Sequence, residues 1–162
     1  MTKTVTIRSP EGEKATAVIL SAFRANGLLL AAGDQLAGEE GLTSARWQVL
    51  GAIALAKRPL TVPQIARRMG LTRQSVHTTV SRLLADGLVE LGANADHRRS
   101  QFVRLTEVGQ EKYDAIDRKQ AVWVNQLVDG LRSSDLEATT RTLNELCTRL
   151  EADHGRAGRE RR

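Results

Sequence analysis

Cysteine and aromatic residues are scarce in this chain, and their scarcity limits what it can be. Cys147 is the single cysteine among 162 residues, which excludes an internal disulfide and a zinc site built on several cysteines. Aromatic residues make up only 3% of the sequence, so a core must consist mainly of leucine, valine, alanine and isoleucine. That composition suits packed helices better than a β-sandwich. We therefore predict a mainly α-helical protein in a reducing compartment, the cytoplasm.

The residues that enzymes and metal sites require are also few. His77, His97 and His154 are the three histidines, and they lie far apart in the sequence with no nucleophile beside them. The sequence has no glycine-rich phosphate-binding loop, and scattered histidines with one cysteine do not form a set of metal ligands. We therefore expect no enzymatic activity, no catalytic residues, no metal and no cofactor.

Long uninterrupted apolar runs are absent as well. Residues 1–10 alternate polar and apolar side chains and lack the features of a secretory signal. The most apolar stretch, residues 18–36, is interrupted by polar and charged side chains that include Arg24 and Asp34. A helix with such interruptions is not expected to cross a bilayer unaided, so we expect no membrane contact.

Basic residues are concentrated in the middle of the chain. Residues 41–106 contain ten basic and three acidic residues, a net charge of +7, whereas the rest of the chain carries −2. A basic segment between nearly neutral flanks is typical of a module that binds a polyanion such as nucleic acid. Charge alone leaves open the alternative of an ordinary solvated basic surface.

Hydrophobic periodicity divides the chain into four segments. A helix predicted over 13–38 is apolar on more than one side, so we expect a partner subunit to cover part of it. The last helix, beginning near Ser134, carries leucines at alternating spacings of three and four, as in a coiled coil, and Cys147 is expected to pack beside them. The predicted segments are an N-terminal dimerisation helix (13–40), a central domain (42–106), C-terminal dimerisation helices (107–153) and a disordered basic tail (154–162).

The central domain has the spacing of a winged helix-turn-helix. Its predicted elements are helices over 44–56, 61–70 and 73–86 and strands over 88–91 and 101–105. Thr61 and Gln64 form a capping box, Gly70 permits the left-handed backbone of a sharp turn, and Thr72 caps the next helix. Two short helices joined by such a turn form the helix-turn-helix, and the strand pair with its polar loop forms a β-wing. We therefore predict a mainly α fold with a small β-wing.

Four motifs in and after this domain resemble a known family. They are residues 71–76 (Leu-Thr-Arg-Gln-Ser-Val), 83–89 (Leu-Leu-Ala-Asp-Gly-Leu-Val), 96–99 (Asp-His-Arg-Arg) and 105–109 (Leu-Thr-Glu-Val-Gly). In this order and spacing they are similar to the MarR family of ligand-responsive transcription regulators. The resemblance implies a homodimer whose terminal helices interlock and whose two winged domains bind a palindromic operator in double-stranded DNA. It also implies that Asp96 braces an arginine of the wing.

The predicted helix over 73–86 presents side chains suited to DNA. Arginine and glutamine can pair with base edges in the major groove, so we expect this face to enter that groove. Its candidate contacts are Arg73, Gln74, His77, Thr78 and Arg82. Thr72 and Ser75, at the helix N-terminus, suit a phosphate oxygen, although Thr72 serves equally well as a cap alone. In the wing, Arg98 and Arg99 suit the minor groove.

These features predict a sequence-specific, dimeric DNA-binding regulator associated with the nucleoid. By resemblance we expect a repressor that a small aromatic or phenolic acid releases from DNA. Arg46 and Trp47 could border the ligand, although Trp47 is expected chiefly as a core residue. The alternative is a ligand-independent winged-helix protein that structures the chromosome, for which footprints would cover DNA without regard to sequence.

Overall fold

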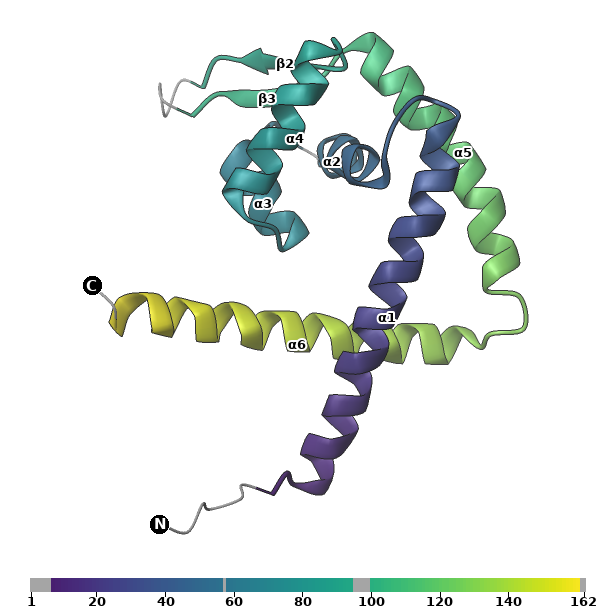
Figure 1. Ribbon diagram of the computed structural model, residues 1–162, viewed down its shortest axis with the longest axis vertical. Helices are drawn as coiled ribbons and strands as arrows, with labels where there is room; N and C mark the ends of the chain where they lie inside the picture. The colour runs from purple at the N-terminus through teal and green to yellow at the C-terminus, as the bar shows by residue number, and fades with distance from the viewer. Residues whose placement is uncertain (1–6, 57, 95–99, 161–162) are drawn as a thin grey trace. The chain divides into compact units, whose positions relative to one another are not determined.

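The computed structural model describes residues 7–56, 58–94 and 100–160 of the chain (Figure 1). Its elements are α1 (Pro10–Gly38), α2 (Ser44–Ala54), β1 (Leu60–Thr61), α3 (Val62–Met69), α4 (Arg73–Ala85), β2 (Val89–Gly92), β3 (Phe102–Leu105), α5 (Glu107–Leu127) and α6 (Ser133–Glu160). Two compact units are present, Met1–Ala121 and Val122–Arg162. The prediction of a mainly helical protein with a small β-wing is confirmed.

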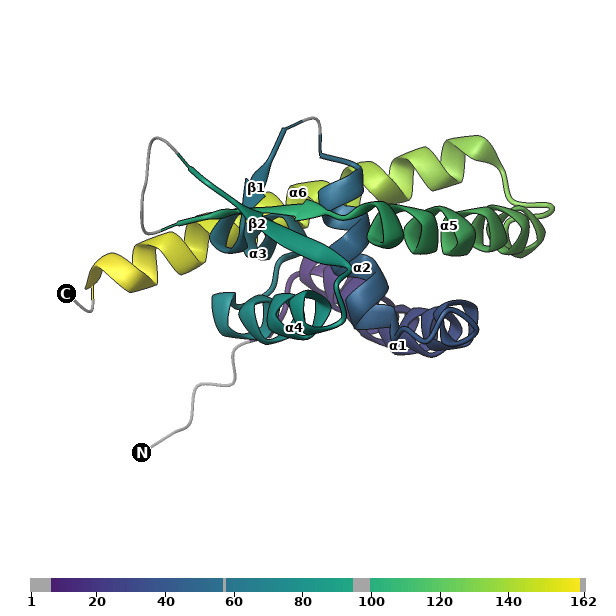
Figure 2. The ribbon, with the colours of Figure 1, turned by 90° about the horizontal axis from the view of Figure 1, so that it is seen from above.

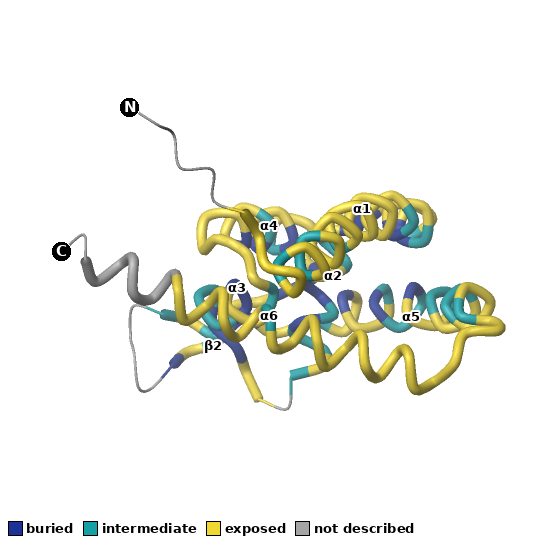
Figure 3. Tube along the Cα trace, turned by 90° about the horizontal axis from the view of Figure 1, so that it is seen from below, coloured by how far each residue is buried: buried dark blue, intermediate teal, exposed yellow. Residues whose placement is uncertain are grey.

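The first unit is built around one hydrophobic core to which every central element contributes. Its largest fully buried side chains are Leu50 of α2, Ile65 of α3, Val76 and Leu83 of α4, Val103 of β3 and Ile116 of α5. Buried positions alternate with exposed ones along α4 and α5 (Figure 3). Both helices are therefore amphipathic, and α4 keeps its other side open to solvent.

The local signals of the helix-turn-helix are confirmed. The Thr61 backbone N–H donates to Gln64 Oε1 at 2.8 Å, which is the glutamine half of the capping box. Gly70 ends α3 with a φ of 64°, in the left-handed region that glycine adopts without strain. The Ser75 N–H donates to Thr72 Oγ1 at 3.1 Å and caps α4.

The sheet has a third strand that the sequence pattern did not predict. Strand β1 pairs antiparallel with β3, with Leu60 opposite Val103, and the strand order is β1-β3-β2 (Figure 2). Two residues are too few to show an alternating pattern. This strand forms because a distant segment offers it a partner, which no local signal could reveal.

The root of the wing is joined to α5 by very close backbone packing. Thr106 N–H donates to Leu88 O at 3.1 Å, and the Thr106 hydroxyl donates to Gly87 O at 2.7 Å. A Cβ atom on Gly109 would lie only 1.9 Å from Leu88 O. Glycine at this position therefore lets the first turn of α5 lie directly against the turn that follows α4.

Gly109→Ala is accordingly expected to lower the free energy of unfolding by roughly 2–3 kcal/mol, since the added methyl group meets backbone rather than a movable side chain. Urea denaturation followed by circular dichroism measures the change. Gly38→Ala is the matched control, because a Cβ there has nothing within 4 Å. Equal loss of stability in both variants would refute the packing argument.

Within the first unit, the buried residues of α1 lie in its C-terminal part, which packs on α2. Gly33 and Ala37 are its buried residues, and a Cβ on Gly33 would lie 2.4 Å from Ser44 Oγ of α2. The Ser44 N–H donates to Asp34 Oδ1 at 2.6 Å, which fixes the start of α2 on α1. The apolar side chains nearer the N-terminus of α1 have no such contact and remain exposed. They are Val18, Ile19, Leu20, Phe23, Leu28, Leu29 and Leu30.

By length and composition alone, α1 is able to cross a membrane. An 18-residue window of it has a mean hydropathy of 1.5. The expectation that the polar interruptions exclude a span is therefore not supported by length and composition. Long apolar helices of soluble proteins pass the same test. Its C-terminal part packs on α2, and the exposed apolar residues give α1 the surface of an interaction helix.

Three polar contacts tie the end of α1 to α5. Lys119 Nζ lies 2.8 Å from Glu39 Oε2 and 3.0 Å from Glu40 Oε1, and Lys112 Nζ donates to the Glu40 carbonyl at 2.7 Å. The hydrogen bond from Lys119 lowers the pKa of Glu39. Because the Glu39 carboxylate is exposed to solvent, the Lys119–Glu39 ion pair contributes little to the free energy of unfolding. Its main effect is to orient α5 against the end of α1.

The second unit consists of the end of α5 and the long helix α6. Leu136, Leu143 and Leu150 of the predicted seam are all exposed in the single chain. Cys147 is exposed as well, so the expectation that it packs within the seam is wrong for the single chain. The predicted disorder from residue 154 also differs from the structure, in which α6 continues to Glu160. Alanine, arginine and glutamate in this stretch favour helix, and proline is absent.

Candidate nucleic-acid interface

The outer face of α4 is the most distinctive polar surface of the first unit. Val76, Val80 and Leu83 are buried on the inner side of the helix. Every described residue predicted to contact DNA lies on the exposed side. These residues are Thr72, Arg73, Gln74, Ser75, His77, Thr78 and Arg82. The amphipathic pattern therefore turns basic and amide side chains outward from a firmly anchored helix.

A groove of about 410 Å³ runs between α4 and the wing. It is lined by Val62, Pro63, Arg73, Gln74, His77, Val80, Ser81, Leu84, Leu91, Ser100 and Gln101. The structure thus brings Arg73, Gln74 and His77 together, whereas Thr78 and Arg82 lie on α4 outside the lining. Ser100 and Gln101 were missed from sequence, because only the folding of the wing brings them beside α4.

Hydrogen bonds within α4 restrict what its hydroxyl groups can offer a ligand. Thr78 Oγ1 donates to the Gln74 carbonyl at 3.0 Å, and Ser81 Oγ donates to the His77 carbonyl at 2.9 Å. Their oxygen lone pairs remain available as acceptors. Thr72 is occupied as the helix cap, so its oxygen is committed while its hydroxyl hydrogen is free to donate.

The charges on α4 are open to a ligand, whereas a neighbouring arginine is used to hold the helix. Among the described residues, neither Arg73 nor Arg82 forms an ion pair. Arg46 instead pairs with Asp86, the C-cap residue of α4, and so fixes its far end on α2. Arg46 is not among the residues that line the cavity beside Trp47.

Asp96, Arg98 and Arg99 complete the set of residues predicted to contact DNA. They lie outside the described residues, so their roles stay predictions.

A separate cavity of about 440 Å³ lies between α2, α3 and α5. We name it the Trp47 pocket; it is lined by Trp47, Gln48, Gly51, Ala52, Leu55, Arg68, Met69, Tyr113, Asp117 and Gln120. The Tyr113 hydroxyl donates to Asp117 Oδ1 at 3.3 Å. Burial raises the pKa of Tyr113, and the carboxylates of Asp117 and Asp114 raise it further, so the phenol stays protonated at neutral pH. Trp47 itself packs against the core, as predicted, while one side of it faces this cavity.

Two helices joined by a tight glycine turn, a three-stranded wing and an open polar face on the second helix define a winged helix-turn-helix DNA-binding protein. Comparison with known proteins gives the family. The family model of the MarR family matches residues 40–100. The chain belongs to the MarR family of transcription regulators, which are not enzymes.

Relatives and solved structures agree with this assignment. The chain is 40% identical over 136 residues to the uncharacterized protein Rv2011c of Mycobacterium tuberculosis, covering 84% of this chain and 94% of that protein. It is 24% identical over 150 residues to the transcriptional activatory protein BadR of Rhodopseudomonas palustris, covering 90% and 86% of the two chains. Staphylococcus aureus MarR, solved in complex with salicylate and kanamycin, has a TM-score of 0.68 at 17% identity and covers 86% of this chain and 94% of that one.

Proposed function

We propose that this regulator is a homodimeric, sequence-specific repressor that binds a palindromic operator through α4. The observation that carries the proposal is the open face of α4, where Arg73, Gln74 and His77 line a groove beside the wing and Arg73 pairs with no acidic residue of the described part of the chain. Arginine and glutamine are the side chains that read guanine and adenine in the major groove. The protein would act in the cytoplasm, on the nucleoid.

The contacts on α4 divide by chemistry. Arg73, Gln74 and Arg82 have donors that suit base edges, and Thr78 offers an acceptor and a methyl group. Thr72 and Ser75 lie at the N-terminus of α4, where hydroxyls and backbone N–H groups suit a phosphate oxygen. From the wing, Asp96, Arg98 and Arg99 are proposed to complete the interface at the minor groove.

A second subunit explains the apolar surfaces that one chain leaves exposed. Phe23 of α1 is 71% exposed and Leu20 is 62% exposed, and Leu136 and Leu143 of the α6 seam are 40% and 38% exposed. Exposed apolar patches of this kind mark protein interfaces. We therefore assign residues 13–40 and 107–153 to dimerisation and residues 42–106 to DNA binding.

The Trp47 pocket suits a small aromatic acid. Trp47 and Leu55 supply apolar surface, Arg68 supplies a cation for a carboxylate, and the Tyr113 phenol supplies a hydroxyl group. Salicylate, which is present in the structure of Staphylococcus aureus MarR, is the corresponding probe. A ligand in this pocket would release DNA only if it binds more tightly to an arrangement of the two subunits that does not fit the operator than to the arrangement that does.

Salicylate is expected to lower the affinity for operator DNA by about tenfold, within the usual range of coupling between two sites. Fluorescence anisotropy with a labelled operator measures this, and Trp47→Leu should reduce the effect while leaving DNA binding without ligand intact. Operator affinity that is identical with and without salicylate and related phenolic acids would refute ligand release. Transcription of the neighbouring genes after deletion of the regulator distinguishes repression from the activation that BadR's name describes.

A further inference from the structure

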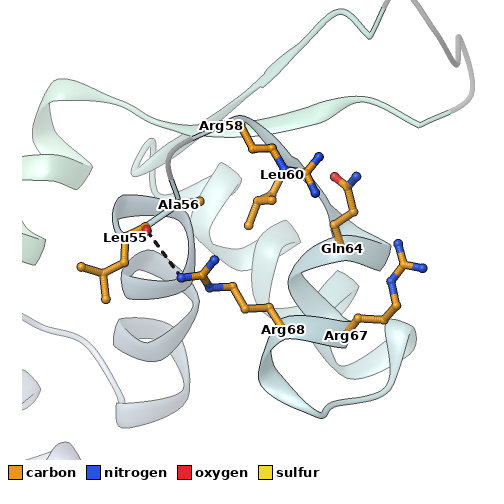
Figure 4. A pocket seen from close by; sticks show the side chains of 7 residues that line it. All are labelled: Leu55, Ala56, Arg58, Leu60, Gln64, Arg67 and Arg68. Atoms are coloured by element: carbon orange, nitrogen blue, oxygen red, sulfur yellow. Dashed lines mark hydrogen bonds between the residues drawn. The ribbon is translucent and has the colours of Figure 1, made fainter. Parts of the chain in front are cut away.

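Next to β1, on the outer face of α3, lies a basic pocket that the DNA-binding role does not use. Its volume is about 560 Å³, and its lining includes Leu55, Arg58, Leu60, Gln64, Arg67 and Arg68 (Figure 4). Val62 and Pro63 of α3 line the α4 groove, whereas Gln64 and the two arginines of α3 line this pocket. The two sites therefore lie on different faces of the same short helix.

The charge of this pocket is not compensated. Three of its lining residues are arginines and none is acidic. Within the described part of the chain, Arg58, Arg67 and Arg68 enter no ion pair, and Arg68 Nη2 donates a 3.4 Å hydrogen bond to the Leu55 carbonyl. Three guanidinium groups gathered in a concavity create a positive potential there, which attracts an anion.

The remaining groups are arranged to receive such an anion. Gln64 Oε1 accepts from the Thr61 N–H, so the free end of this amide is its NH₂ donor. In Figure 4 the Arg58 side chain extends over Leu60 toward Gln64, and the guanidinium group of Arg67 lies on the other side of Gln64. Leu60 is only 4% exposed and forms an apolar floor beneath these donors.

We propose that this pocket binds a free organic phosphate with two or more phosphate groups. The guanidinium groups of Arg58 and Arg67 and the Gln64 amide bind the phosphate oxygens, because arginine forms paired hydrogen bonds with such oxygens. The carbon part of the ligand lies on Leu60 and Leu55. A concavity of this size accommodates a nucleotide-sized molecule. The site is distinct from the proposed aromatic-acid site, although Leu55 and Arg68 border both.

Calorimetric titration with ADP, inorganic pyrophosphate and adenosine tests the proposal on the full-length protein. We expect ADP and pyrophosphate to bind and adenosine not to bind. The Arg58→Gln/Arg67→Gln variant should lose about tenfold or more in ADP affinity, since each arginine supplies charged hydrogen bonds. Arg141→Gln/Arg149→Gln removes the same charge from α6 and should leave ADP affinity unchanged. Trp47→Leu should also leave ADP affinity unchanged. The phosphate-site proposal can therefore fail or hold independently of the aromatic-acid proposal.

Two results would overturn the proposal. If the wild-type protein does not bind ADP or pyrophosphate, but Arg58→Gln/Arg67→Gln weakens duplex binding and lowers its salt dependence, these arginines contact the DNA backbone instead. If neither phosphate binding nor duplex binding responds to the double substitution, the pocket is an ordinary solvated basic surface.

Discussion

Replacing both Phe23 and Leu143 with glutamate is expected to separate the proposed dimer into monomers. Phe23 is 71% exposed on α1 and Leu143 is 38% exposed on α6 in the single chain, and the proposed function assigns both helices to dimerisation. A glutamate at a subunit contact either loses its hydration or keeps the subunits apart. Affinity for a palindromic operator should then fall by about 100-fold or more, because each half-site is bound without the gain from a linked second domain.

Sedimentation velocity gives the oligomeric state of this variant, and fluorescence anisotropy gives its operator affinity. Ile7→Glu is the control, since Ile7 is 86% exposed and lies outside the residues assigned to dimerisation. Circular dichroism of the double variant verifies that the helical fold is retained. A folded variant that stays dimeric would remove α1 and α6 from the interface as proposed.

The largest loss of sequence recognition is expected from Arg73→Ala combined with Gln74→Ala. Both side chains line the groove between α4 and the wing, and Arg73 forms no ion pair with another described residue. A paired contact with one base contributes about 1–3 kcal/mol, so the double variant should bind the operator roughly 100-fold more weakly. Binding to unrelated duplex DNA, which depends on phosphate charge, should change much less.

Competition between operator and unrelated duplexes measures both affinities in one experiment. Gln110→Ala/Arg118→Ala is the matched control, because it removes the same residue types from exposed positions of α5. We expect the control to bind the operator like the wild-type protein. Equal weakening on operator and unrelated DNA in the α4 variant would mean that these side chains contact only the backbone.

The elements that the sequence predicted well are those fixed by local chemistry. Gly70 adopts the left-handed turn, Thr72 caps α4, and Val76 and Leu83 are buried as their spacing indicated. These features depend on residues within one helical turn of each other. The exposed face of α4 follows directly from the same amphipathic pattern, which is why its candidate DNA contacts could be named in advance.

The features that the sequence did not predict depend on distant partners. Strand β1 exists because Leu60 pairs with Val103, and Lys119 reaches Glu39 and Glu40 across almost half of the chain. Arg58 lies beside α3, and so lines the basic pocket, because the chain turns through β1. Cys147 was expected to be covered, but a seam that needs a second helix stays open in one chain. Pairings and pockets of this kind arise from tertiary structure rather than from local pattern.

Selection of bound duplexes from a random oligonucleotide pool tests the central claim most directly. If paired α4 helices read the major groove, repeated selection enriches a palindrome whose half-sites lie about one helical turn apart, roughly 10 base pairs centre to centre. The Arg73→Ala/Gln74→Ala variant then fails to enrich it. A pool that binds tightly yet remains random in sequence would contradict the account and favour a protein that coats DNA.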